Sequence, residues 1–246
     1  MELWDIGLLA SAGLLGGLCN AIAGGGTFFI FPALLTIGLP PVSAGATSAI
    51  SIWPGHAAGL IGEGRVLRDD LGRRPGRIAI FAFASAAGAG LLLVSGDALF
   101  RALVPWLLLF ATILFAVGPA LNRWLTRRGI RTADGPAALF EGVVALYGGF
   151  FGAGLGVMLL AVLTITEGEE IARLNVVKNG LATLATSIAI LIFAASGAVA
   201  WGPAAVVFLG AVAGGMLGGR LARRVNPQIL RIFVVCVGLA LVFYYA

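Results

Sequence analysis

Residues 19–40 read CNAIAGGGTFFIFPALLTIGLP, and the glycine triplet at 24–26 interrupts a long apolar sequence. An apolar run at 6–23 precedes the triplet and a second run, 27–38, follows it. The second run is shorter than the roughly 20 helical residues that cross a bilayer. The sequence therefore predicts a helical hairpin with glycines at its tip.

The composition is that of a helical membrane protein. Hydrophobic residues make up 60% of the 246 residues and charged residues only 11%, whereas soluble domains are about 45–50% apolar and about 25% charged. The long apolar runs lack the short alternating segments of a membrane barrel. The 37 glycines suit close helix contacts in lipid. We therefore predict an all-α, polytopic membrane protein.

Eight further apolar runs follow the first hairpin, and one of them is short. They lie at about 43–61, 77–95, 98–121, 136–152, 156–166, 172–196, 202–219 and 227–245. The short run, 156–166, follows a second glycine cluster between Gly152 and Gly156. This pattern predicts a second hairpin, formed by 136–152 and 156–166.

The arginines lie in short clusters between apolar runs. Loop 62–77 holds five, loop 122–135 holds four and the turn 220–231 holds four. By the positive-inside rule these segments are cytoplasmic. We therefore predict a multi-pass protein of the bacterial inner membrane with both termini in the periplasm. The formal charge of +5 thus reflects topology. No basic stripe interleaved with aromatic residues indicates nucleic-acid binding.

The two halves of the chain resemble each other at an offset of about 130 residues. Gly26 corresponds to Gly156, and Leu99-Phe100-Arg101 corresponds to Ile229-Leu230-Arg231. We predict two inverted repeats, 1–121 and 136–246, joined by a cytoplasmic linker at 122–135. Each repeat contains a glycine-tipped hairpin and three transmembrane helices. Inverted repeats are typical of secondary transporters.

The hairpin tips are the first candidates for a binding site. Broken backbone at membrane depth survives only where it is buried in protein or lines a cavity. The helix after each tip presents free N–H groups and a positive dipole end, which suit an anion. The alternative is that glycines here serve only helix packing, as Gly13-x-x-x-Gly17 does. The tip candidates for substrate binding are Gly24, Gly25, Gly26, Thr27, Gly152, Gly154 and Gly156.

Polar residues near the tips extend the candidate substrate site. They are Asn20, Thr47 and Ser48 in the first half and Asn175, Lys178 and Asn179 in the second. A cation at membrane depth usually faces a cavity or a partner. Lys178 lies only two turns into its apolar run, so the alternative is that its side chain snorkels to the membrane surface.

Glu141 and His56 are the candidates for proton coupling. Glu141 could instead pair with an arginine near the cytoplasmic face, and His56 could be a packed, hydrogen-bonded residue beside Pro54 and Gly55. Since His56 is the only histidine, and Cys19 and Cys236 are far apart and predicted to be buried hydrophobes, we expect no metal site, disulfide or cofactor.

Other functional classes lack their motifs. An intramembrane serine protease needs a GxSx-type serine with a histidine partner, a metalloprotease needs HExxH, and a nucleotide-binding loop needs GxxxxGK[ST]. None of these occurs. A channel remains an alternative, although nothing resembles a potassium filter, and two hairpins fit alternating access better.

Several motifs resemble the sulfite exporter TauE/SafE family, also called the toluene-sulfonate uptake permease family. They are AGGGTFFIFPALL at 23–35, GLPPV at 38–42, ATS at 46–48, YGGFFGAGLG at 147–156 and NVVKN at 175–179. The second half lacks the glycine triplet and following proline of the first. The resemblance implies secondary transport of sulfite, sulfonates or related sulfur-containing anions. Another small anion, such as a carboxylate, is the alternative substrate.

Overall fold

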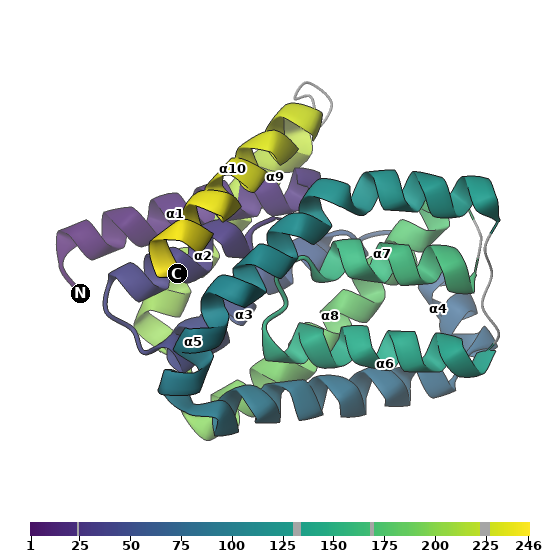
Figure 1. Cartoon of the computed structure of the whole chain (residues 1–246), viewed down its shortest axis with the longest axis horizontal. Coiled ribbons are helices and arrows are strands. Elements are labelled where there is room, and N and C mark those ends of the chain that lie inside the picture. Colours follow the sequence, from purple (N-terminus) through teal and green to yellow (C-terminus); the bar gives the residue numbers. More distant parts are fainter. Residues whose placement is uncertain (24, 130–133, 168–169, 222–226) are drawn as a thin grey trace.

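The protein is described here from a computed structural model that covers residues 1–23, 25–129, 134–167, 170–221 and 227–246. These residues contain ten helices and no strand (Figure 1). The helices are α1 (Leu3–Ala23), α2 (Thr27–Thr36), α3 (Pro41–Ala58), α4 (Gly64–Arg73), α5 (Gly76–Arg128), α6 (Asp134–Phe150), α7 (Leu155–Thr166), α8 (Ile171–Ser196), α9 (Trp201–Leu221) and α10 (Pro227–Tyr245). The all-α prediction is confirmed.

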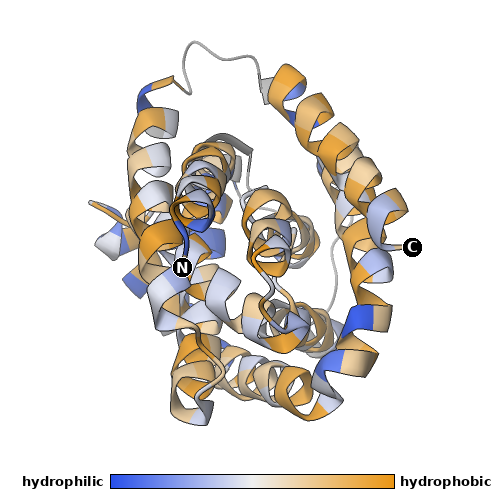
Figure 2. Ribbon diagram, turned by 90° about the vertical axis from the view of Figure 1, so that its left-hand side faces the viewer, coloured by the Kyte–Doolittle hydropathy of each residue, from blue (hydrophilic) through white to orange (hydrophobic). Residues whose placement is uncertain are grey.

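The helices have the length and surface of a multi-pass membrane protein. Five of those in the described residues are long and apolar enough to cross a bilayer, whereas α2, α6 and α7 are shorter. Large apolar side chains point outward, among them Trp106, Leu191 and Phe243, with exposed fractions of 69%, 66% and 82%. Hydrophobic residues accordingly occupy much of the length of the helices in the ribbon of Figure 2. Contact of such an apolar surface with lipid costs little free energy, unlike contact with water.

Both short runs form the second arm of a hairpin. α2 packs on α1, and α7 packs on α6. At the second tip Gly152 and Gly154 have φ values of +74° and +75°, which glycine adopts without strain. At the first tip Gly26 has a helical φ of −60°, but a side chain there would come within 2.8 Å of the Gly16 carbonyl oxygen. The two tips thus need glycine for different reasons.

One predicted boundary is confirmed, and one helix was not predicted. The runs 77–95 and 98–121 lie in α5 as two helices that meet at Gly96, whose backbone is not helical, with φ at +69° and ψ at +166°. The predicted loop 62–77 contains a helix, α4, which packs on α8. Its half-buried Val66, Leu67 and Leu71 lie at helical spacing among charged residues. The prediction missed α4 because arginines dominate this segment.

The first arm of each hairpin packs closely on a helix from the other half of the chain. α1 packs on α9, where a side chain at Gly13 would come within 2.5 Å of the Val207 carbonyl oxygen. α6 packs on the first part of α5, where Gly149 lies against the backbone of Ser85. Small residues thus allow backbone contact at both interfaces, which confirms the packing interpretation for Gly13.

The cysteine prediction is half wrong. Cys19 is buried, but Cys236 is exposed, and both are free thiols. Cys236 lies on α10, a helix with only a small share of its residues buried. An apolar run does not show which of its faces turns to protein and which to lipid.

Candidate substrate site

A polar cavity of about 230 Å³ lies among α1, α3, α5, α7, α8 and α10. Its lining residues are Asn20, Gly55, His56, Pro119, Asn122, Gly156, Val157, Leu160, Asn175, Lys178, Asn179 and Arg231. Four asparagines and two cations therefore converge on one space. Such convergent polar groups in a largely apolar protein mark a candidate binding site.

The cavity lies toward the end of the bundle that carries the arginine-rich loops. Lys178 is about two turns from the start of α8, and Asn122 is about two turns from the end of α5. Arg231 lies in the second turn of α10. By contrast, Gly156 lies at the second hairpin tip, so the cavity extends from that tip toward the arginine-rich end.

Lys178 makes a hydrogen bond within its own helix. Its Nζ atom donates to Oδ1 of Asn175 over 2.9 Å. A side chain at Gly156 would lie 3.8 Å from Cδ of Lys178, so the lysine stem passes over the second tip. Among the described residues no carboxylate pairs with Lys178. An ammonium group has three N–H donors, which leaves donors available in the cavity.

Two asparagine amides rest on the backbone at the end of α3. A side chain at Gly55 would overlap Nδ2 of Asn20, and one at Gly59 would overlap Nδ2 of Asn179. These two glycines hence let α1 and α8 bring their amides against α3. The packing fixes the position of both amides at the cavity wall.

The structure gathers some of the predicted site residues and not others. Asn20, Gly156, Asn175, Lys178 and Asn179 line the cavity, and so does His56. The remaining predicted residues within the described part of the chain are absent from the lining: Gly25, Gly26, Thr27, Thr47, Ser48, Gly152 and Gly154. Gly24 lies outside the described residues.

The predicted residues outside the lining pack in the core. Thr47 accepts a hydrogen bond from the Ala200 N–H over 3.1 Å, and Ser48 is buried. The nearest atoms to side chains built at Gly25 and Gly154 include Phe115 and Ala111, respectively. Since these two residues are one turn apart on α5, both hairpin tips approach the same part of that helix.

Asn122 and Arg231 line the cavity but were not predicted as site residues. Both lie in the arginine-rich segments, where the positive-inside rule already accounts for polar and basic residues. The sequence signal for Arg231 was its correspondence with Arg101 in the repeat. That correspondence does not show which cavity each of the two arginines lines.

A second, larger cavity is less suited to an anion. It measures about 470 Å³ and is lined by Leu35, Gly38, Leu39, Pro40, Pro41, Asp97, Arg101, Val104 and Tyr245. Its charged groups are one carboxylate and one guanidinium. Asp97 accepts a hydrogen bond from the Val42 N–H over 2.9 Å, as expected of a residue that caps the start of α3. The smaller cavity has more convergent donors.

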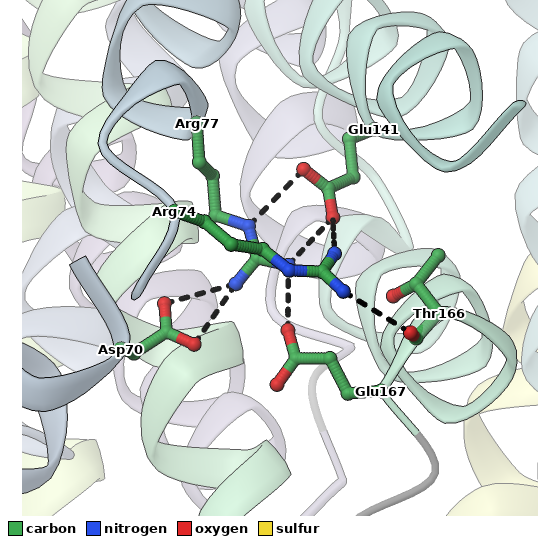
Figure 3. A network of polar contacts seen from close by, with 6 residues as sticks. All are labelled: Asp70, Arg74, Arg77, Glu141, Thr166 and Glu167. Carbon is green, nitrogen blue, oxygen red and sulfur yellow. Dashed lines mark hydrogen bonds and ion pairs between the residues drawn. The ribbon is translucent and has the colours of Figure 1, made fainter. Parts of the chain in front are cut away.

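Glu141 lies away from the cavity, in a buried ionic network centred on Arg77 (Figure 3). The Arg77 guanidinium donates to Glu141 over 3.1 and 2.7 Å, to Asp70 over 3.0 and 2.9 Å and to Glu167 over 2.5 Å. Arg74 also approaches Glu141, at 3.8 Å, and donates to the Thr166 carbonyl oxygen. The expected pairing of Glu141 with an arginine is confirmed.

The network joins four elements at the arginine-rich end. Asp70 comes from α4, Arg77 from the start of α5, Glu141 from α6, and Glu167 from the residue after α7. Burial raises the pKa of the Glu167 carboxyl, and the Arg77 guanidinium opposes that rise.

Long apolar helices, glycine-tipped hairpins and a cationic cavity between them define a membrane transporter. The chain belongs to the sulfite exporter TauE/SafE family, whose sequence model matches residues 9–245. It is similar to the probable membrane transporter protein YfcA of Escherichia coli (strain K12), with 28% identity over 94% of this chain and 86% of the relative.

Two other relatives have similar identity. A probable membrane transporter protein of Haemophilus influenzae is 27% identical over 94% of this chain and 90% of its own length. The probable membrane transporter protein ORF9 of Sinorhizobium sp. is 27% identical over 96% of this chain and 90% of its own length. No solved structure matches the chain.

Proposed function

We propose that the protein is a secondary transporter that moves sulfite, organosulfonates or related small sulfur-containing anions across the bacterial inner membrane. The observation that carries this proposal is the position of Lys178 in a cavity that holds four asparagine amides and, among the described lining residues, no carboxylate. Ammonium and amide N–H groups are the donors that the oxygens of a sulfonate need. The sulfur chemistry rests on the family.

The packing of the hairpins supports an inverted repeat with alternating access. α1 packs on α9 while α6 packs on α5, and α2 packs on α10 while α7 packs on α5. If 1–121 and 136–246 are equivalent halves, α1 corresponds to α6 and α2 to α7. Each helix of one pair then packs on the counterpart of the helix that contacts its equivalent. In this arrangement each hairpin lies against helices of the opposite half, and rocking of one half on the other would open the central cavity alternately to the two sides.

The same arrangement fits a cavity that opens to the cytoplasm. The arginine-rich loops are then cytoplasmic by the positive-inside rule, and both termini are periplasmic. Of the two residues considered for proton coupling, His56 lines the cavity with Lys178, whereas Glu141 is held by Arg77. Proton coupling, if present, would therefore involve His56 more directly than Glu141.

A carrier for another small anion, such as a carboxylate, is the second candidate. The same donors serve a carboxylate, and none of the described lining residues is specific for sulfur. Binding of a matched panel of sulfonates, sulfite and carboxylates to the purified protein separates the two candidates.

Replacement of Lys178 tests the proposed site. Loss of a charge-assisted hydrogen bond costs about 1.5–3 kcal/mol, so Lys178→Met should weaken binding of a sulfonate about 10- to 100-fold. Lys178→Arg keeps the charge but changes its shape, and should retain part of the affinity. Calorimetry with ethanesulfonate on the detergent-purified protein gives the dissociation constants.

A matched control removes a positive charge elsewhere. Arg127 is exposed near the end of α5 and does not line the cavity, so Arg127→Met should leave the dissociation constant within about two-fold of the parent. If Lys178→Met binds as the parent does, Lys178 only snorkels, and the proposed site is wrong.

A further inference from the structure

The cavity has a second cation, and it comes from a different wall. Lys178 belongs to α8, which packs on α3 to α7, whereas Arg231 belongs to α10, which packs on α5, α1 and α2. Both side chains nevertheless line the same space. The cavity is therefore positive on two sides rather than at one point.

Within the described part of the chain, no acidic side chain neutralises the positive charge at Arg231. Among the described residues no carboxylate forms an ion pair with Arg231 or Lys178. Arg123, near the end of α5, adds a repulsive positive charge to the surroundings of Arg231. Two guanidinium groups that repel each other beside a cavity are stabilised when an anion binds between or next to them.

The side chains around Arg231 suit a second oxyanion group. The planar guanidinium can bind a carboxylate or sulfonate through two parallel N–H donors, and the Asn122 amide, which also lines the cavity, supplies another N–H donor. The cavity volume of about 230 Å³ is several times the share of about 30 Å³ that one water takes in the liquid. A molecule with two anionic groups therefore has room.

We infer that the cavity selects doubly charged anions over singly charged ones, with Lys178 and Asn175 holding one negative group and Arg231 and Asn122 the other. This inference rests on the proposed function for the location of the site. The ligand class is a small sulfonate with a second anionic group, or a doubly charged inorganic oxyanion. Arg231 is in this view a specificity residue for charge.

Pairs of probes that differ in charge but little in shape test the inference. Sulfate is compared with methanesulfonate, and 3-sulfopropionate with propane-1-sulfonate, by calorimetry at fixed ionic strength. Because one more charge-assisted contact forms, the parent protein should bind each dianion at least about 10-fold more tightly than its partner. Preference within only the first pair identifies an inorganic dianion, and within only the second pair a bifunctional sulfonate.

Arg231→Gln should remove the preference. The dianion should lose about 10-fold in affinity, while the monoanion should change less than about three-fold. Arg127→Gln, which removes an exposed charge outside the cavity lining, should keep the preference. Equal binding of both members of each pair by the parent, or an equal loss for both in Arg231→Gln, overturns the inference.

A third pair keeps this result separate from the identity of the substrate. Glutarate is compared with butyrate in the same assay. If the sulfur compounds do not bind but glutarate binds more tightly than butyrate, and Arg231→Gln removes that difference, the charge selection stands and the proposed sulfur function fails. If no probe binds to the folded parent protein, both are overturned.

Discussion

Replacing Arg77 with methionine should strongly destabilise the protein. Arg77 is only 2% exposed, and its guanidinium is the common partner of Asp70, Glu141 and Glu167. Removing one partner of a buried ion pair costs about 3–5 kcal/mol, because the remaining charge has neither water nor a counter-ion. Arg77→Met leaves three such carboxyl groups.

Two features of the network set the expected size of the loss. Arg74 lies 3.8 Å from Glu141 and can neutralise part of the negative charge of that carboxylate when Arg77 is absent. Buried carboxyl groups can also bind protons instead of remaining ionised. Both responses limit the loss, so we expect about 3 kcal/mol, the lower end of that range. Denaturant unfolding of the purified protein in detergent, followed by circular dichroism, measures it.

Two further variants identify the cause of the loss. Arg127→Met, at an exposed position, should stay within about 0.5 kcal/mol of the parent. Combining Arg77→Met with neutral amides at the three carboxyl positions should recover part of the stability, because no buried charge is then left alone. If Arg77→Met unfolds as the parent does, the network does not hold α4, α5, α6 and the end of α7 together.

Three other predictions concern the cavity wall, the topology and the pH dependence. Gly59→Ala should displace the Asn179 amide and weaken anion binding about 10-fold by calorimetry, with little loss of helicity; unchanged binding would mean that the amide is not needed there. In a chain without its native cysteines, Ser196→Cys should react with a membrane-impermeant maleimide added outside sealed cells, and Asp69→Cys should not; the opposite pattern would reverse the topology. Burial raises the pKa of Glu167, so its stabilising contribution is greatest below the ordinary pKa of a glutamate and is lost as the pH rises through the raised value. Glu167→Gln should therefore show a smaller fall in stability between about pH 4.5 and pH 7 than the parent, and identical pH profiles would contradict the assignment.

The sequence predicted the helices well because their signals are local. The length of an apolar run determines whether a helix can span the bilayer, so the short runs 27–38 and 156–166 appear as the short helices α2 and α7. The prediction missed α4, whose few apolar residues lie among arginines. It correctly separated the two parts of α5, because the break at Gly96 lies between the runs 77–95 and 98–121.

The candidate site was predicted in part. Lys178, Asn175 and Asn179 were found because polar residues are conspicuous in an apolar run, and Asn20 because it lies beside the glycine triplet. The same reasoning included Thr47, which accepts a hydrogen bond from the Ala200 N–H in the core. A polar residue near a hairpin tip can face either a cavity or a neighbouring helix, and the amino-acid sequence around it does not distinguish these two positions.

The sequence by itself determined the class of protein: an all-helical membrane transporter of the TauE/SafE family, with two glycine-tipped hairpins. Only the tertiary structure decided which charges face the cavity. Arg231 lies 53 residues after Lys178 in the chain, on a helix that shares only α5 with the neighbours of α8, yet both line one space. Helix formation depends on residues within a few turns of one another. A cavity depends on how helices far apart in the chain pack together, and a local sequence pattern does not predict that packing.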